Sequence, residues 1–278
     1  MASNIVTHAT VGTDIARSWL LVAAHSEEDL RAGVTSDADQ VVIDLEDGVP
    51  QALKAHARDH ARRVLTAGAQ AWVRINSVET DEWRKDLDAL RGAPGVRGLV
   101  VAKAESARDV DAVVSASELP VIALVESALG IARALEIATA DGVVRLAFGS
   151  GDYRRDTGAS DSELAMSFPR SSLVVASRAA KLPGPIDGPT VGRDREIMFS
   201  QSRAALDLGM TGRLCLSVHQ AAAFNDLARP STSDDVWART FLQEFQRRGG
   251  AVRDGSELPR IHRAQSIQRL VAAFGVRD

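Results

Sequence analysis

The chain has 278 residues, of which 45% are apolar and 25% are charged, a composition typical of globular proteins. Its net charge of -4 and pI of about 5.9 give it no general electrostatic attraction to nucleic acid or to an anionic membrane surface. From this charge we expect no nucleic-acid partner. The chain also has no run of about 18 apolar residues, so we expect no membrane span.

Eight short apolar runs recur along the chain, and several are nearly continuous in hydrophobicity. They are Trp19–Ala24, Val41–Leu45, Ala71–Ile75, Leu99–Ala102, Val121–Val125, Val144–Phe148, Pro185–Ile186 and Leu214–Val218. Runs of this kind are typical of parallel strands that are buried on both faces. The seventh run is the weakest, because proline and glycine surround it.

Amphipathic patterns with helical spacing fill the gaps between these runs. The clearest are Pro50–Ala67, Ser106–Ala116, Ser162–Lys181 and Asp194–Leu208. Alternating strands and helices indicate an α/β protein with a parallel sheet. Eight such units favour a closed (β/α)8 TIM barrel over a doubly wound sheet, and no G-x-G-x-x-G motif follows the first strand.

The segment after the eighth strand continues the helical pattern. It contains the predicted helices Gln220–Leu227, Thr232–Arg248 and Arg260–Phe274, with a loop rich in glycine and charge at Arg248–Pro259. The segment is too short to form a core of its own. We therefore expect a barrel domain over residues 1–228 and a helical extension over residues 229–278 that packs on the barrel or on a neighbouring subunit.

The only cysteine, Cys215, lies inside an apolar run, so no intrachain disulfide can form. Residues Met1–Ile15 lack an apolar segment of secretory length. Both features are typical of a protein in a reducing compartment, and we expect a cytoplasmic location.

Polar side chains recur where the predicted strands end. Glu46 follows the second strand, Arg74 lies at the end of the third, Lys103 follows the fourth, Glu126 the fifth and Asp152 the sixth. Because the carboxyl ends of all barrel strands meet at one face, we expect these side chains to surround one pocket.

Glu126 and Asp152 follow adjacent predicted strands and would repel each other unless a cation or a proton joined them. No histidine or cysteine cluster accompanies them, so an all-oxygen site for Mg²⁺ is the metal hypothesis. The alternative is that Glu126 pairs with Arg74 or Lys103 while Asp152 caps a helix.

Arg74 has a planar guanidinium that can bind two oxygens of a substrate carboxylate. Its alternative role is an ion pair with Glu46 or Asp47, and the two roles are compatible. Lys103 either neutralises the pocket or is a solvated strand end.

Several motifs together resemble a known family in their order and spacing. They are Arg17-Ser-Trp-Leu-Leu-Val, Val-Ile-Asp-Leu-Glu46-Asp47-Gly-Val-Pro, Val-Arg74-Ile-Asn, Val-Ala-Lys103-Ala-Glu-Ser, Ala-Leu-Val-Glu126-Ser-Ala-Leu-Gly, Phe-Gly-Ser-Gly-Asp152-Tyr and Pro-Ile-Asp187-Gly-Pro. From about Arg17 onward, the chain resembles the HpcH/HpaI aldolase and citrate lyase family, in particular stand-alone proteins similar to the citrate lyase beta subunit.

The resemblance implies a (β/α)8 barrel and a Mg²⁺-dependent carbon–carbon lyase. Its substrate would be a 3-hydroxyacyl-CoA thioester, such as citryl-, malyl- or citramalyl-CoA, cleaved to acetyl-CoA and a keto acid or formed from them. By likeness, Glu126 and Asp152 hold the metal and, with Gly151, contact the substrate. Arg74 binds the substrate oxygens and Glu46 orients it, while Arg17 lies near the CoA or the substrate.

The sequence departs from the family at three places. Ala23-Ala24-His25 replaces the usual Pro-Gly after the first strand, Val218-His219 replaces the usual His-Pro after the eighth, and Asp254 is only a candidate for the aspartate of a C-terminal lid. A metal-dependent aldolase acting on a free keto acid without CoA, and a non-catalytic homologue that retains the pocket, are the alternatives. Family relatives also lead us to expect a homo-oligomer, a trimer or hexamer, whose C-terminal segment covers a barrel mouth.

Overall fold

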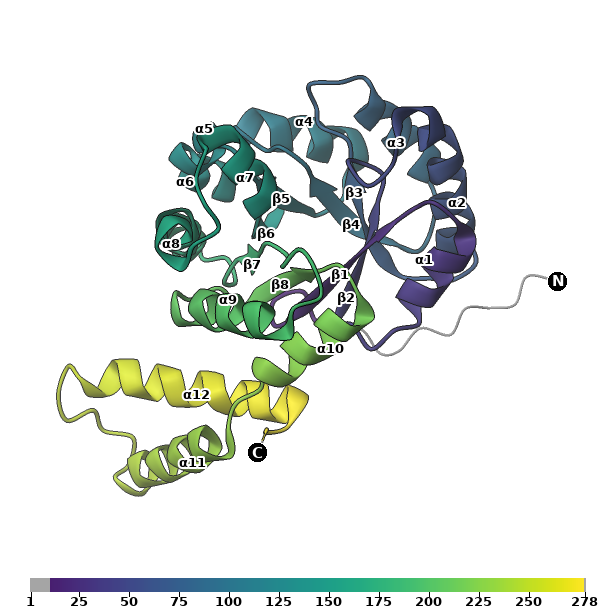
Figure 1. The fold of residues 1–278 in the computed structure, drawn as a ribbon. Helices are drawn as coiled ribbons and strands as arrows, with labels where there is room; N and C mark the ends of the chain where they lie inside the picture. The colour runs from purple at the N-terminus through teal and green to yellow at the C-terminus, as the bar shows by residue number, and fades with distance from the viewer. Residues whose placement is uncertain (1–10, 278) are drawn as a thin grey trace. The chain divides into compact units, whose positions relative to one another are not determined.

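Eight parallel strands close into a barrel in a computed structural model of the chain, which describes residues 11–277 (Figure 1). The strands are β1 Ser18–Ala23, β2 Gln40–Asp44, β3 Ala71–Ile75, β4 Val96–Val101, β5 Val121–Val125, β6 Val143–Phe148, β7 Ile186–Asp187 and β8 Gly212–Cys215. Each strand pairs with the next, and β8 pairs with β1 to close the ring. The barrel and its strand order confirm the predicted fold class.

Helices surround the strands in Figure 1 and connect one to the next. They are α1 Glu27–Val34, the 3₁₀ turn η1 Gln51–Leu53, α2 Lys54–Thr66, α3 Glu82–Leu90, α4 Ala107–Ser117, α5 Ala128–Ala132, α6 Ala134–Ala138, α7 Ser150–Thr157, α8 Glu163–Ala179, α9 Arg195–Asp207 and α10 Val218–Leu227. The four clearest predicted helices are present as η1 with α2, α4, α8 and α9.

The strands are apolar on both faces because they separate two cores. Side chains inside the barrel include Trp19 and Trp72, whose rings meet edge to face with their centroids 5.9 Å apart. Side chains between the strands and the helices include Ile43, Leu99 and Val101. A strand covered on both sides reads as a continuous apolar run, which is the pattern that the sequence shows.

The amino-terminal end of the barrel is closed by buried polar contacts. Arg17 donates from Nε and Nη2 to the two carboxylate oxygens of Asp39, both at 2.9 Å. The fully buried Arg145 donates to the carbonyl oxygens of Thr13, Ala16 and Gly184 at 2.7–2.9 Å. The segment before β1 is thereby fastened across this end.

The chain divides into two compact units after Phe224, whereas the predicted extension begins at residue 229. The second unit contains α11 Thr232–Arg247 and α12 Glu257–Phe274. Within it, Trp237 of α11 stacks on Phe241 with ring centroids 5.7 Å apart, and Arg263 of α12 lies over the Trp237 ring. Across residues 11–277, every helix is too short or too polar to span a lipid bilayer.

Candidate active site

Charged side chains gather at the carboxyl ends of β2 to β5. Asp44 is the last residue of β2, Arg74 lies in β3 beside it, and Lys103 and Glu126 follow β4 and β5. Glu46 lies two residues beyond β2 and is buried. The structure thus brings Glu46, Arg74, Lys103 and Glu126 together, as the strand ends predict.

Asp44 fixes Arg74. Arg74 Nε donates to Asp44 Oδ1 at 2.7 Å and Nη2 donates to Oδ2 at 2.6 Å, while Nη1 lies 3.3 Å from Glu46 Oε2. Burial works to lower the pKa of Arg74, but hydrogen bonds and charge from Asp44 and the charge of Glu46 raise it above its ordinary value. The guanidinium therefore stays charged and keeps its Nη1 group for another ligand.

Sequence reasoning missed Asp44 as the main partner of Arg74 and proposed Glu46 or Asp47 in that role. The signal was present, since Asp44 ends a strand whose register places it directly beside Arg74. Asp44 also accepts hydrogen bonds from the backbone N–H groups of Glu46 and Gly48, at 2.8 and 2.9 Å. One carboxylate thereby orders both the arginine and the turn that follows β2.

Lys103 connects two of the acids. Its Nζ donates to Glu46 Oε1 at 2.7 Å, and its backbone N–H donates to Glu126 Oε1 at 2.8 Å. Its backbone has a φ of 53°, in the left-handed region that few non-glycine residues adopt. Lys103 is therefore an ordered part of the site, and the alternative of a solvated strand end is wrong.

Glu126 is buried, and its carboxylate packs against the backbone of Gly149. A Cβ atom added to Gly149 would lie 2.2 Å from Glu126 Oε2, so only glycine leaves room for this carboxylate. Burial, together with the charge of Glu46, raises the pKa of Glu126 to about 8. In the metal-free protein this group therefore holds a proton at neutral pH.

Asp152 lies in the first turn of α7, which begins at Ser150, and this position corrects the expectation of a strand-end residue. Its carboxylate is partly exposed and lies 3.2 Å from Arg155 Nη1. The preceding Gly151 is exposed and has open space beside it. Glu126 and Asp152 line one cavity of about 220 Å³, which is also lined by Glu79, Lys103, Glu105, Ser127, Arg155 and Asp156.

The donor set of this cavity suits Mg²⁺. Across residues 11–277, no three His, Cys, Asp or Glu side chains gather as a metal-ion cluster. Mg²⁺ needs no such cage, because it keeps several waters and takes oxygens from its substrate. Glu126 is a buried carboxylate close to the further negative charges of Glu46 and Asp152, and a divalent cation would relieve this repulsion. Glu126 and Asp152 therefore fit the ion.

Arg17 corrects a second expectation, because it lies at the opposite end of the barrel. It precedes β1, and its carbonyl oxygen accepts the N–H of Arg213 at the start of β8. Since all eight strands are parallel, this end lies a strand length away from Glu126. The side chain is buried against Asp39, so Arg17 cannot contact a substrate at the carboxyl ends.

Asp254 lies in the C-terminal unit, where its side chain bonds Ser256, the residue just before α12. Asp254 Oδ1 accepts hydrogen bonds from the N–H and the Oγ of Ser256, at 2.8 and 2.6 Å. A role for Asp254 as a lid residue stays a prediction.

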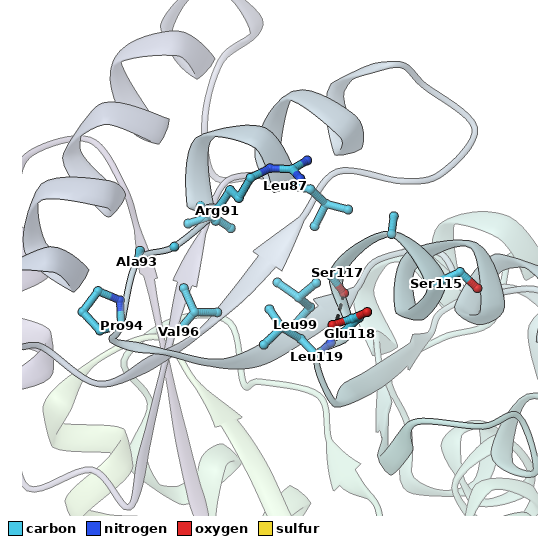
Figure 2. Close-up of a pocket in the computed structure, with 13 residues that line it drawn as sticks. Leu87, Arg91, Ala93, Pro94, Val96, Leu99, Ser115, Ser117, Glu118 and Leu119 are labelled. Carbon is cyan, nitrogen blue, oxygen red and sulfur yellow. Dashed lines mark hydrogen bonds between the residues drawn. The ribbon is translucent and has the colours of Figure 1, made fainter.

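A larger cavity of about 560 Å³ lies away from this chemistry (Figure 2). It is formed by the end of α3, the segment leading into β4 and the end of α4, with Leu87, Leu99 and Leu119 in its wall. Helices end and strands begin at the amino-terminal side of such a barrel, whereas active sites lie at the opposite face. Glu118 is the only carboxylate in its lining, so this cavity offers no pair of metal ligands.

Comparison with known proteins finds a family match over most of the chain. The model of the HpcH/HpaI aldolase/citrate lyase family matches residues 17–217, and that of the HpcH/HpaI aldolase C-terminal domain matches residues 233–275. The chain is 27% identical to a (3S)-malyl-CoA thioesterase of Cereibacter sphaeroides, over 93% of this chain and 96% of the relative. It is 32% identical to a citrate lyase subunit beta-like protein of Mycobacterium tuberculosis, over 84% of this chain and 86% of the relative.

Solved structures show the same similarity. CitE from Mycobacterium tuberculosis, in complex with magnesium, acetoacetate and coenzyme A, superposes with a TM-score of 0.78 at 29% identity, covering 93% of this chain and 98% of that one. A citrate lyase beta subunit from the same organism, complexed with oxaloacetate and magnesium, gives a TM-score of 0.68 at 30% identity, covering 77% and 98% of the two chains. Magnesium is present in both of these structures.

Proposed function

Since the chain belongs to the HpcH/HpaI aldolase/citrate lyase family, we propose that it is a Mg²⁺-dependent carbon–carbon lyase acting on a 3-hydroxyacyl-CoA thioester such as citryl-, malyl- or citramalyl-CoA. The products of cleavage are acetyl-CoA and a keto acid. The observation that carries the proposal is the cavity that Glu126 and Asp152 both line, near Arg74, whose guanidinium is oriented by two hydrogen bonds to Asp44.

Glu126 and Asp152 are the proposed ligands of Mg²⁺, and Gly151 leaves open space beside them for a substrate. When bound, Mg²⁺ supplies a Lewis acid that polarises substrate oxygens and offsets developing negative charge. Similar proteins support the choice of Mg²⁺, because solved relatives hold magnesium with acetoacetate or oxaloacetate.

Arg74 is the proposed electrophilic partner of the metal. With Nε and Nη2 engaged by Asp44, its Nη1 group can donate to a keto acid oxygen. A fixed donor of this kind stabilises charge that appears as the carbon–carbon bond breaks, because it needs no reorganisation at that moment. Glu46 and Lys103 hold one another at the edge of the pocket and keep Arg74 oriented.

The reaction class can be tested with a panel of CoA thioesters and the matching free acids, each with and without Mg²⁺. A lyase releases a keto acid while the thioester bond of the acetyl product stays intact. A thioesterase, the activity named for a relative, releases free CoA thiol and no keto acid. An aldolase that needs no CoA would release the keto acid equally well from the free hydroxy acid. Thiol release without keto acid would contradict the proposal.

We also propose a cytoplasmic homo-oligomer, a trimer or hexamer, in which the C-terminal unit of one subunit covers the barrel mouth of another. The support is that α11 and α12 keep exposed apolar side chains, among them Val236 and Leu258. Light scattering should give a mass well above the 29.7 kDa of one chain. Truncation before Thr232 should lower turnover and leave Mg²⁺ binding unchanged, while a monomer at micromolar concentration would contradict the assembly.

A further inference from the structure

A second polar cavity of about 110 Å³ lies among α7, α8, α9 and the loop after β7. Three arginines line it: Arg154 from α7, Arg170 from α8 and Arg213 from β8. Ser150, Thr190 and Gln201 add hydroxyl and amide groups to the same wall. The volume has room for several water molecules, and therefore for one small anionic group.

Two of these arginines share a single acid. Arg170 donates to both carboxylate oxygens of Asp187 at 2.9 and 3.1 Å, and Arg213 Nη1 donates to Asp187 Oδ2 at 2.6 Å. Arg170 and Arg213 are only 4% and 2% exposed, and Asp187 is fully buried. One carboxylate therefore neutralises one of two buried positive charges.

The remaining charge is not balanced at the cavity mouth. Arg154 Nη1 and Asp161 Oδ2 lie 3.7 Å apart as an ion pair, and because their charges are opposite this pair adds no net charge. Counting Arg154, Arg170 and Arg213 against Asp161 and Asp187 leaves one surplus positive charge. A surplus charge away from water is costly unless a counter-ion is near, and guanidinium groups match the oxygens of phosphate and carboxylate in geometry.

Donors remain available for such an ion. The hydrogen bonds of Arg170 to Asp187 use Nε and Nη2, which leaves the Nη1 group as a further donor on this cavity-lining side chain. Arg213 Nη2 donates to Thr190 Oγ1 at 2.7 Å, and the Thr190 hydroxyl donates in turn to Gln201 Oε1 at 2.8 Å, so this hydroxyl is already engaged. Positive charge and the Nη1 donor group of Arg170 thus lie at one small space that Ser150 also lines.

We propose that this cavity is an anion site that binds a phosphate group, separate from the metal site. Ser150, the first residue of α7, lines the anion cavity, and Asp152, two residues later, lines the metal cavity. The first turn of α7 therefore stands between the two.

The test measures binding of inorganic phosphate to the full-length protein by calorimetry, without Mg²⁺ and at constant ionic strength. We expect saturable binding to the wild type and at least fivefold weaker binding to Arg154→Gln. Arg154 is partly exposed and does not belong to the buried ion pairs of Asp187 with Arg170 and Arg213, so this variant should fold normally. Arg133→Gln, which removes an exposed arginine elsewhere on the barrel, is the matched control and should bind like the wild type.

Absence of saturable phosphate binding to the wild type would overturn the proposal, and so would equal binding by Arg154→Gln. In that case the arginines serve only to join α8, β7 and β8. Because neither measurement involves turnover, failure here leaves the proposed lyase function untouched.

A second arm identifies the source of the phosphate and rests on the proposed function. If the site receives a phosphate of the CoA substrate, adenosine 3′,5′-bisphosphate should displace inorganic phosphate and bind more tightly. If the site receives free phosphate, the nucleotide should bind no better than phosphate itself. Both results support the anion site and differ only in the molecule that fills it.

Discussion

The two ends of the barrel both bury charged side chains, but they treat them differently. At the amino-terminal end, Arg17 is matched to Asp39 by two hydrogen bonds, and the guanidinium of Arg145 is bonded to carbonyl and hydroxyl oxygens. At the carboxyl end, Glu126 remains close to the negative charges of Glu46 and Asp152, and its pKa is raised to about 8 by burial and by Glu46.

A buried charged group whose hydrogen bonds are made within the protein stabilises one structure, whereas a buried carboxylate held close to like charges can bind a cation. The carboxyl end is therefore the expected place of binding and catalysis, and the charged groups of the amino-terminal end are expected to stabilise the fold. Substitutions at the two ends should separate activity from stability.

The largest effect should come from the proposed metal ligands. Asp152→Ala should abolish detectable Mg²⁺ binding in calorimetry and lower kcat/KM by more than about 1,000-fold, or about 4 kcal/mol of transition-state stabilisation. Asp156→Asn is the control, because Asp156 lines the same cavity but is exposed and bonds the N–H of Ala128. Equal Mg²⁺ affinity in the wild type and Asp152→Ala would remove Asp152 from the metal site.

Arg74→Lys should lower kcat/KM by about 100-fold, or about 2.7 kcal/mol, with a smaller loss in the free energy of unfolding. Lysine keeps the charge but cannot bond both oxygens of Asp44 and still present Nη1 to a substrate. Steady-state kinetics together with urea denaturation measure the two effects. Activity within about threefold of the wild type would show that Arg74 is structural.

Mg²⁺ affinity should depend on pH. The pKa of Glu126 is raised from 4.5 to about 8, so Mg²⁺ must displace a proton at neutral pH, and apparent affinity should rise by close to tenfold from pH 6 to pH 7 and level off above pH 8. Between pH 4.5 and pH 8, Glu126 binds more protons in the metal-free folded state than in the unfolded state. The free energy of unfolding of the metal-free protein should therefore fall as pH rises from 4.5 to 8.

Calorimetry in two buffers with different ionisation enthalpies would count the released protons. Asp156→Asn should retain the full pH dependence, since it leaves Glu126 and its neighbours in place. Affinity that is constant between pH 6 and pH 8 would contradict the assignment of Glu126 as a ligand.

Substitution at the other end should have the smallest effect on turnover. Arg17→Gln leaves Asp39 buried without its cation and should lower the free energy of unfolding by about 3 kcal/mol. The kcat of the folded fraction should match the wild type, because Arg17 lies a strand length from the metal ligands. A loss of kcat without a loss of stability would show that Arg17 takes part in turnover and would contradict the difference between the two ends.

Much of the fold could be predicted because parallel strands buried on both faces leave a plain signal. Each of the eight apolar runs overlaps a strand, even the two-residue β7. The short helices α5, α6 and α7 were harder to predict from the sequence, since five to eight residues give a weak hydrophobic periodicity. The residues Gly-Ser-Gly before Asp152 were interpreted as a strand end, although Gly149 is the N-cap of α7 and Ser150 and Gly151 are its first residues.

The site could be predicted in part, because position after a strand indicates which residues converge. Glu46, Arg74, Lys103 and Glu126 followed that rule, and Arg17, which precedes its strand, did not. Position along the strand predicts that Arg17 lies at the amino-terminal end of the barrel, whereas resemblance to the family predicted a position near the substrate. The anion cavity gave no such signal, because Arg170 and Arg213 lie 43 residues apart and only the folded chain joins them through Asp187.

Gly149 has a consequence for the thermodynamics of metal capture. Because the Glu126 carboxylate packs in the space that a side chain at position 149 would fill, and accepts the N–H of Lys103, it is held in one conformation before any ion arrives. Ordering a free glutamate side chain costs up to about 2 kcal/mol of conformational entropy. Here the side chain is ordered when the barrel folds. If Glu126 binds Mg²⁺ as proposed, the entropy of binding should therefore reflect mainly the release of water from the ion.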